Sequence, residues 1–163
     1  MGRAEIIIQL VNENPGIRYS EIMRETGLKN GVLSHHLSKI EQAGKIVIER
    51  TPRVARLYPC GTPQEETLVI KHLKSPTARK VLTALLESDL SFKEIVNKVK
   101  KSQGTVSLSL KSMCDEDIVE RTFVNGNLAF HLTNKALLNS LVEKQPTFIE
   151  NSANNISDIF SSI

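Results

Sequence analysis

The sequence contains few of the residues from which ligand pockets and metal sites are commonly built. Its 163 residues include no tryptophan, and aromatic residues make up only 4% of the chain. This scarcity argues against a deep aromatic ligand pocket and against a base-stacking platform. Only two cysteines are present, Cys60 and Cys114, and they show no metal-ligand spacing. We therefore expect both to be free thiols in a reducing compartment.

Long apolar runs are also missing. The first residues, MGRAEIIIQLVNENPG, contain an apolar run of only three residues, Ile6–Ile8. A run this short can form neither the core of a signal peptide nor a membrane span, so we expect a cytoplasmic protein with no membrane partner. The net charge of +3 and the isoelectric point near 8.9 are mildly basic. This balance permits nucleic acid as a partner without requiring it.

Signatures of catalysis are missing too. The four histidines do not occur in the H-x3-H or H-E-x-x-H spacings of zinc sites. His35 and His36 are adjacent, and neighbouring side chains on a helix point about 100° apart, so this pair cannot readily chelate one ion. The chain has no Walker loop, G-x-S-x-G motif or dinucleotide fingerprint. We predict no catalytic residues, no metal ligands and no cofactor.

An internal repeat organises the chain. A shift of 73 residues lays IRYSEIMRETGLKNGVLSHHL (17–37) over LSFKEIVNKVKKSQGTVSLSL (90–110) without a gap. The register continues into the segments that follow, where Leu57 meets Phe130. The identical pairs include Glu21/Glu94, Ile22/Ile95, Gly31/Gly104, Ser34/Ser107 and Leu37/Leu110. Because such a match is hard to obtain by chance, we infer two copies of one module.

Each copy predicts the same order of elements. A helix with apolar spacing is followed by a short extended segment, a brief helix, a tight turn and a third helix. The third helix covers about 30–43 in the first copy and about 103–116 in the second. Two strands then form a hairpin, and Asn125-Gly126 gives a strong turn signal in the second copy. This order is typical of winged helix-turn-helix modules.

The predicted fold is therefore mainly α with small β-hairpin wings (α+β), built from two tandem winged helix-turn-helix modules. The predicted boundaries are module 1 at 1–60, a connector loop and helix at 61–75, module 2 at 76–145, and a C-terminal tail at 146–163. The tail has two open interpretations. It is either a frayed or disordered end, or a dimerisation helix that packs on a second subunit.

The third helix of module 1 has one apolar face and one polar face. At about 100° per residue, Leu33, Leu37 and Ile40 share the face that we assign to the core. His36 lies at the edge of that face and is predicted to be a packed, hydrogen-bonded structural residue. The opposite side suits base edges and phosphates in a major groove, with an ordinary solvated surface as the alternative. Its polar residues are Asn30, Ser34, His35, Ser38, Lys39 and Gln42.

The wing of module 1 is rich in arginine. Arg50, Arg53 and Arg56 cluster around the hairpin tip with no acidic residue between them. Residues 1–60 carry nine Lys/Arg against six Asp/Glu, so this module holds the excess of positive charge. Arginine suits phosphate contacts and narrow minor grooves. We therefore predict that all three arginines contact DNA.

Module 2 allows two interpretations. Its third helix would present a plausible groove-facing set: Gln103, Thr105, Ser107, Leu108 and Lys111. However, the helix runs into three acidic residues at 115–117, and the tip of the wing has no basic residue. Residues 76–145 carry ten basic against eight acidic side chains. Module 2 is thus predicted either to contact DNA with this set or to serve dimerisation or the binding of another protein.

A family resemblance supports this assignment. The run NPGIRYSEIMRETGLKNGVLSHHLSKIEQAGKI resembles the winged helix-turn-helix of ArsR/MarR-type transcription regulators, especially archaeal regulators with two such modules in tandem. SQGTVSLSLKSM is a second, looser match, and the resemblance covers about 2–60 and 76–144. It implies groove contacts by the third helix and wing contacts by Arg53 and Arg56. With Lys29, which directly precedes the helix, the predicted groove contacts are Lys29, Asn30, Val32, Ser34, His35, Ser38 and Lys39.

The chain also departs from these families. ArsR-type metal sensors carry a cysteine-containing motif on the recognition unit, or carboxylate and histidine ligands on a terminal helix, and neither is found in this sequence. The long flanking helices with which MarR-type proteins dimerise are missing as well. The resemblance therefore implies neither metal sensing nor the MarR-type dimer geometry.

Together these features predict a sequence-specific transcriptional regulator that binds double-stranded DNA. It would read the major groove with the third helix of module 1 and contact phosphates or the minor groove with its wing. It is not expected to be an enzyme, and it would be nucleoid-associated in the cytoplasm, as a monomer or a homodimer. The alternative is a tandem winged-helix subunit of a transcription or chromosome-organising complex, with a transcription-machinery protein as its partner.

Overall fold

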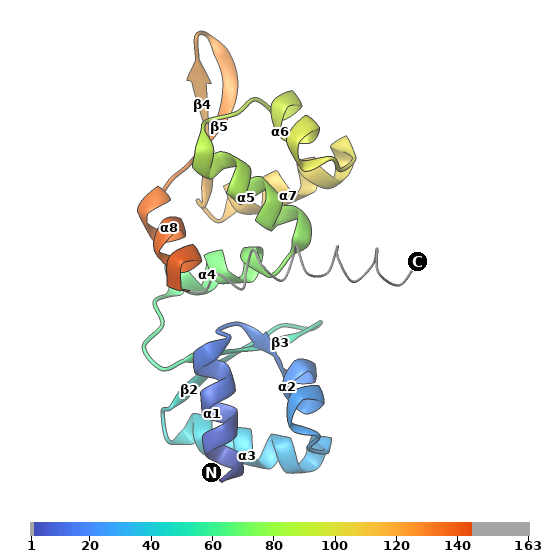
Figure 1. Ribbon diagram of the computed structural model, residues 1–163, viewed down its shortest axis with the longest axis vertical. Helices are drawn as coiled ribbons and strands as arrows, with labels where there is room; N and C mark the ends of the chain where they lie inside the picture. Colours follow the sequence, from blue (N-terminus) through green and yellow to red (C-terminus); the bar gives the residue numbers. More distant parts are fainter. Residues whose placement is uncertain (1, 145–163) are drawn as a thin grey trace. The chain divides into compact units, whose positions relative to one another are not determined.

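Two compact units, which divide after Thr67, make up the chain (Figure 1). The structure is a computed structural model and describes residues 2–144. The division falls inside helix α4 (Gln64–Leu73), which lies within the connector predicted at 61–75. The boundaries predicted at residues 60, 75 and 145 stay predictions. Both interpretations of the tail at 146–163 concern residues outside the described range.

Unit 1 contains the predicted helices and wing in the predicted order. Its three strands form one antiparallel sheet in the order β1-β3-β2, so β3 is the central strand. The second helix ends at Gly27, whose positive φ of 70° suits glycine. The elements are α1 (Arg3–Glu13), β1 (Ile17–Arg18), α2 (Tyr19–Thr26), α3 (Asn30–Gln42), β2 (Ile46–Arg50) and β3 (Ala55–Pro59).

The core of unit 1 is formed where α1, α2 and α3 meet the sheet. Leu33, Leu37 and Ile40 of α3 are buried, which confirms the apolar face predicted for this helix. They pack with buried side chains from the other elements: Ile7, Val11, Ile17, Ile22, Ile46 and Leu57. Because one face of α3 is fixed against this core, the opposite face is turned to solvent.

Unit 2 repeats this architecture. Its wing is a two-stranded sheet, and the counterpart of β1 is reduced to a single bridge between Leu90 and Phe130. Val106, Leu110 and Met113 form the buried face of its third helix. The elements that follow α4 are α5 (Pro76–Glu87), α6 (Phe92–Val99), α7 (Gln103–Asp115), β4 (Val119–Val124), β5 (Asn127–Leu132) and α8 (Lys135–Lys144).

The register of the strands confirms the repeat. In the first wing Glu49 lies opposite Arg56, and in the second Thr122 lies opposite Ala129. Both residues of the second pair follow those of the first by the 73 residues found in the sequence. The two wings therefore match position by position.

Adjacent residues of α3 offer a test of this core. Leu33→Ala removes a fully buried side chain and leaves a cavity, and we expect it to lower the free energy of unfolding by ~2–5 kcal/mol. Val32→Ala changes the neighbouring side chain, which is exposed to solvent, and should cost no more than ~0.5 kcal/mol. Urea denaturation followed by circular dichroism measures both. Equal losses for the two variants would contradict the assignment of the buried face.

Candidate nucleic-acid interface

The outer face of α3 is polar and open to solvent. All seven groove contacts predicted for module 1 are exposed: Lys29, Asn30, Val32, Ser34, His35, Ser38 and Lys39. The helix contains a single acidic residue, Glu41, near its C-terminal end. Because the apolar face of α3 is fixed against the core, these side chains stay on the solvent side of the helix.

The two adjacent histidines of α3 have different environments. His35 is exposed and His36 is half-buried, in agreement with the helix geometry. Their rings meet edge to face, with centroids 6.0 Å apart. Within residues 2–144 no protein group is hydrogen-bonded to His36, so its predicted hydrogen bond stays a prediction. Because the ring of His36 is partly exposed, water can satisfy its nitrogen atoms.

Tyr19 contacts Asn30, the first residue of α3. Its hydroxyl contacts the side-chain oxygen of Asn30 and lies 2.9 Å from the carbonyl oxygen of the same residue, to which it can donate. Burial raises the pKa of Tyr19, so the hydroxyl keeps its proton. Sequence reasoning missed this contact because Tyr19 and Asn30 lie 11 residues apart and the fold brings them together. The signal would have been that Phe92, its counterpart, lacks the hydroxyl.

A groove of about 320 Å³ separates α3 from the wing. Asn30, Ser34 and Ser38 line it from the helix, and Ile48 and Arg50 line it from β2. Four residues predicted as DNA contacts are therefore brought together around one concave surface.

An ion pair connects the wing to the end of α3. Both terminal nitrogens of Arg50 donate to the carboxylate of Glu41, at 3.0 and 3.1 Å. This hydrogen bonding lowers the pKa of Glu41, so the carboxylate stays ionised. Sequence reasoning missed Glu41, which lies nine residues before its partner. In contrast, Arg53 is exposed at the hairpin tip and has no partner within the described residues.

Arg56 does not belong to the exposed surface. Its side chain is only 7% exposed, and Nη1 donates to the carbonyl oxygen of Gly16 at 2.9 Å. Burial lowers its pKa. The hairpin alone would leave this arginine on an edge, but β1 pairs with β3 and makes β3 the central strand. The prediction that Arg56 contacts DNA is therefore corrected, because its guanidinium is directed into unit 1.

Unit 2 has a different chemistry at the corresponding surface. Leu108 and Phe123 are each 72% exposed, and they occupy the positions of His35 and Arg50. Lys111 is paired with Asp115 at 3.0 Å. All residues predicted for the helix of module 2 are exposed: Gln103, Thr105, Ser107, Leu108 and Lys111. The face is accessible, but it is more apolar than that of module 1.

The described residues contain neither a candidate metal site nor a candidate membrane span. Within 2–144 there is no group of three or more His, Cys, Asp or Glu side chains placed to hold a metal ion. Cys60 and Cys114 are free thiols. None of the helices described is long and apolar enough to cross a membrane.

Comparison with known proteins gave one family and several distant structures. A search of curated proteins found no match. The transcriptional repressor BigR from Xylella fastidiosa is 24% identical, with a TM-score of 0.42, over 48% of this chain and 84% of that chain. HlyU from Vibrio cholerae is 22% identical, with a TM-score of 0.41, over 47% and 86%. The E41A mutant of ZitR from Lactococcus lactis is 16% identical, with a TM-score of 0.41, over 82% and 83%.

The family match covers both modules. The family described as "Bacterial regulatory protein, arsR family" matches residues 2–46 and 75–121, which together make up more than half of the chain. Each segment runs from the first helix of a module to the start of its wing. Regulators of this family bind DNA and are generally not enzymes. This chain belongs to the arsR family of regulatory proteins and carries two of its winged helix-turn-helix modules in tandem.

Proposed function

We propose that the chain binds specific sequences of double-stranded DNA through module 1 and thereby regulates transcription. The observation that carries this proposal is the exposed polar face of α3 beside a wing whose Arg53 has no partner among residues 2–144. Membership of the arsR family supports it. We assign no catalytic role to any residue.

The proposed reading of bases depends on the first half of α3. Asn30 has the donor and acceptor pair that matches adenine in the major groove, and Ser34 and His35 supply further hydrogen-bonding groups. Lys29 and Lys39 flank these side chains and would contact phosphates. Phosphate contacts fix the position of the helix, while the shorter polar side chains supply the specificity.

The two exposed arginines of the wing would have separate tasks. Arg53, which has no partner in the described part of the chain, is proposed to contact a phosphate or to enter the minor groove. Arg50 is engaged by Glu41, so its proposed task is to hold the wing at a fixed distance from α3. Arg56 is left out of the proposed interface because it is buried.

A second function is favoured by one observation in unit 2. Leu108, Phe123 and Leu128 expose apolar surface at positions where module 1 has His35, Arg50 and Ala55. Specific protein–DNA interfaces are polar and strongly positive, whereas exposed aromatic and aliphatic side chains commonly anchor protein partners. We therefore propose that module 2 contributes protein contacts, including contacts with the transcription machinery.

The role of Arg53 can be tested without knowledge of the operator. Arg53→Ala should weaken binding to all DNA sequences alike and reduce the slope of log K against log salt by about one. Fluorescence anisotropy with bulk duplex DNA at several salt concentrations measures this slope. Arg3→Ala removes the same charge from α1, outside the proposed interface. An equal change in slope for Arg3→Ala would show that only the net charge matters.

The coupling of Tyr19 to Asn30 makes a sharper prediction about specificity. Asn30→Ala should relax the preference at one base position by ~1–3 kcal/mol, measured by selection from a random duplex library followed by affinity measurements. Tyr19→Phe removes only the hydroxyl that orients Asn30, so we expect a smaller loss at the same position. In the Asn30→Ala background Tyr19→Phe should have no further effect. Additive losses, or losses at different base positions, would show that Tyr19 and Asn30 act independently and would contradict this prediction.

A further inference from the structure

The hairpin of unit 2 ends in a segment without a charged side chain. Residues 122–130, TFVNGNLAF, contain neither an acid nor a base. Phe123 and Leu128 lie opposite each other in this hairpin and are 72% and 45% exposed. The wing of unit 1 exposes Arg50 and Arg53 in the corresponding part. Charged side chains protect exposed strands from pairing with other strands, and the wing of unit 2 lacks this protection.

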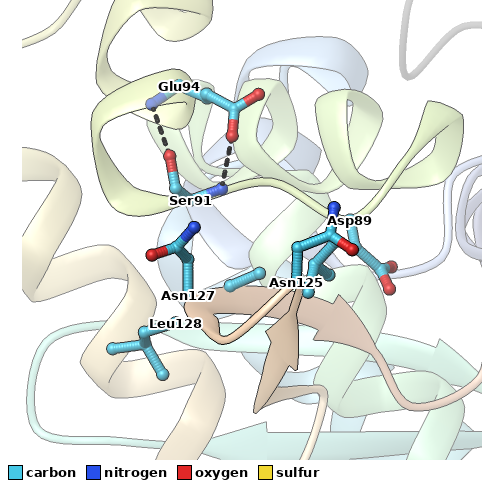
Figure 2. A pocket seen from close by; sticks show the side chains of 8 residues that line it. Asp89, Ser91, Glu94, Asn125, Asn127 and Leu128 are labelled. Carbon is cyan, nitrogen blue, oxygen red and sulfur yellow. Dashed lines mark hydrogen bonds between the residues drawn. The ribbon is translucent and has the colours of Figure 1, made fainter.

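The hairpin also has an open edge. Among residues 2–144, β4 pairs with β5 alone. The other side of β5 faces the segment before α6, because Leu90 bridges Phe130 and because Ser91 and Asn127 line the same pocket (Figure 2). The outer edge of β4 is therefore the edge that another strand can reach.

The backbone of β4 directs hydrogen-bonding groups to this edge. Phe130 donates its N–H to the carbonyl oxygen of Leu90 at 2.8 Å and accepts from the N–H of Leu90 at 3.3 Å, so its backbone groups point away from β4. Residues directly opposite each other in an antiparallel pair either exchange hydrogen bonds or both turn their backbone groups outward. Arg121 lies opposite Phe130, and Phe123 follows two residues later. The N–H and C=O groups of Arg121 and Phe123 therefore point to the open edge.

The sequence of β4 restricts how two copies of the strand can pair. Opposite residues of an antiparallel sheet point to the same face, so the two-fold axis between two copies must pass through a residue position. An axis at Glu120 or at Arg121 sets like charges opposite each other, which destabilises a sheet. An axis nearer either end leaves at least half of the strand unpaired. Thr122 is the position that remains.

An axis at Thr122 gives a self-complementary pairing of residues 120–124. Arg121 of each copy then lies opposite Phe123 of the other. This pair can exchange hydrogen bonds, because both residues turn their backbone groups to the edge, and the guanidinium can lie over the aromatic ring. Glu120 lies opposite Val124, so like charges do not meet.

We propose that two copies of this chain associate through their β4 strands, in the antiparallel register centred on Thr122, so that their hairpins form one continuous sheet. This rests on the role proposed for module 2 in protein contacts and names a second copy of the chain as the partner. The association would satisfy the open backbone groups of β4 and would cover the exposed ring of Phe123.

Sedimentation velocity on the full chain tests the association. The chain is measured from about 1 to about 500 µM, because interfaces of small area bind weakly, and we expect a dimer whose fraction rises with concentration. Phe123→Arg gives β4 the residue found at this position in module 1. It sets like charges opposite Arg121 of the second copy, and we expect at least about tenfold weaker association. Leu108→His is the matched control, because Leu108 is also 72% exposed but lies on α7, and it should leave the association unchanged.

Three outcomes would overturn the proposal: a monomer at every concentration, a dimer that persists in Phe123→Arg, or equal effects of Phe123→Arg and Leu108→His. A chain that stays monomeric but binds duplex DNA in the anisotropy measurement leaves the function proposed for module 1 intact. Loss of DNA binding in a chain that still dimerises would contradict the function of module 1 alone.

Disulfide cross-linking tests the register. In a background with Cys60→Ser and Cys114→Ser, which removes the free thiols, Thr122→Cys should give a linked dimer on mild oxidation. The reason is that residue 122 lies opposite itself at the axis, where Cα atoms are about 4.5 Å apart. Glu120→Cys is the control on the same strand, because its two copies would be about 14 Å apart, too far for a disulfide. Equally fast cross-linking of both variants, or none with Thr122→Cys, would refute this register.

Discussion

The apolar stripe of α3 is the constraint on which the interface depends. Leu33, Leu37 and Ile40 fix the rotation of the helix, and this rotation determines which residues solvent or DNA can reach. Val106, Leu110 and Met113 do the same in α7. The two modules thus share an inner frame, while their outer faces are free to differ. Substitutions on the outer faces of α3 and α7 can therefore change the exposed chemistry of a module without affecting the buried residues that hold the helix in place.

Most of the fold follows from local signals in the sequence. The third helices begin and end within one residue of the predicted limits, because apolar periodicity and helix-stop residues lie within each segment. The hairpins were also predictable, because the repeat contains the wing twice and the pattern of each copy supports the other. The contacts of Arg56, Arg50 and Tyr19 could not be predicted from the sequence. Each depends on a partner brought close by the fold, such as the pairing of β1 with β3, and spacing along the chain does not reveal such partners.

The two modules share the buried residues that the fold requires and differ in the residues that they expose to solvent. His35 is exposed on the same helix on which His36 lies half-buried at the margin of the core, so adjacent identical residues have different environments. Arg50 in one wing and Phe123 in the other occupy the same position with opposite chemistry. The identical apolar pairs Ile22/Ile95 and Leu37/Leu110 are buried in both copies, whereas the exposed positions of the wings and third helices differ in chemistry.

The contrast between Arg56 and Ala129 has a consequence for how the two copies can diverge. An arginine buried under one sheet ties the strand segment before α2 to the wing, and this tie is complete within a single module. In unit 2 the equivalent segments are joined by the bridge between Leu90 and Phe130 and by the hydrogen bond between Asp89 and His131. The two modules therefore hold the segment before their second helix against the wing with different side chains, so one substitution can weaken this contact in one module and leave the other intact.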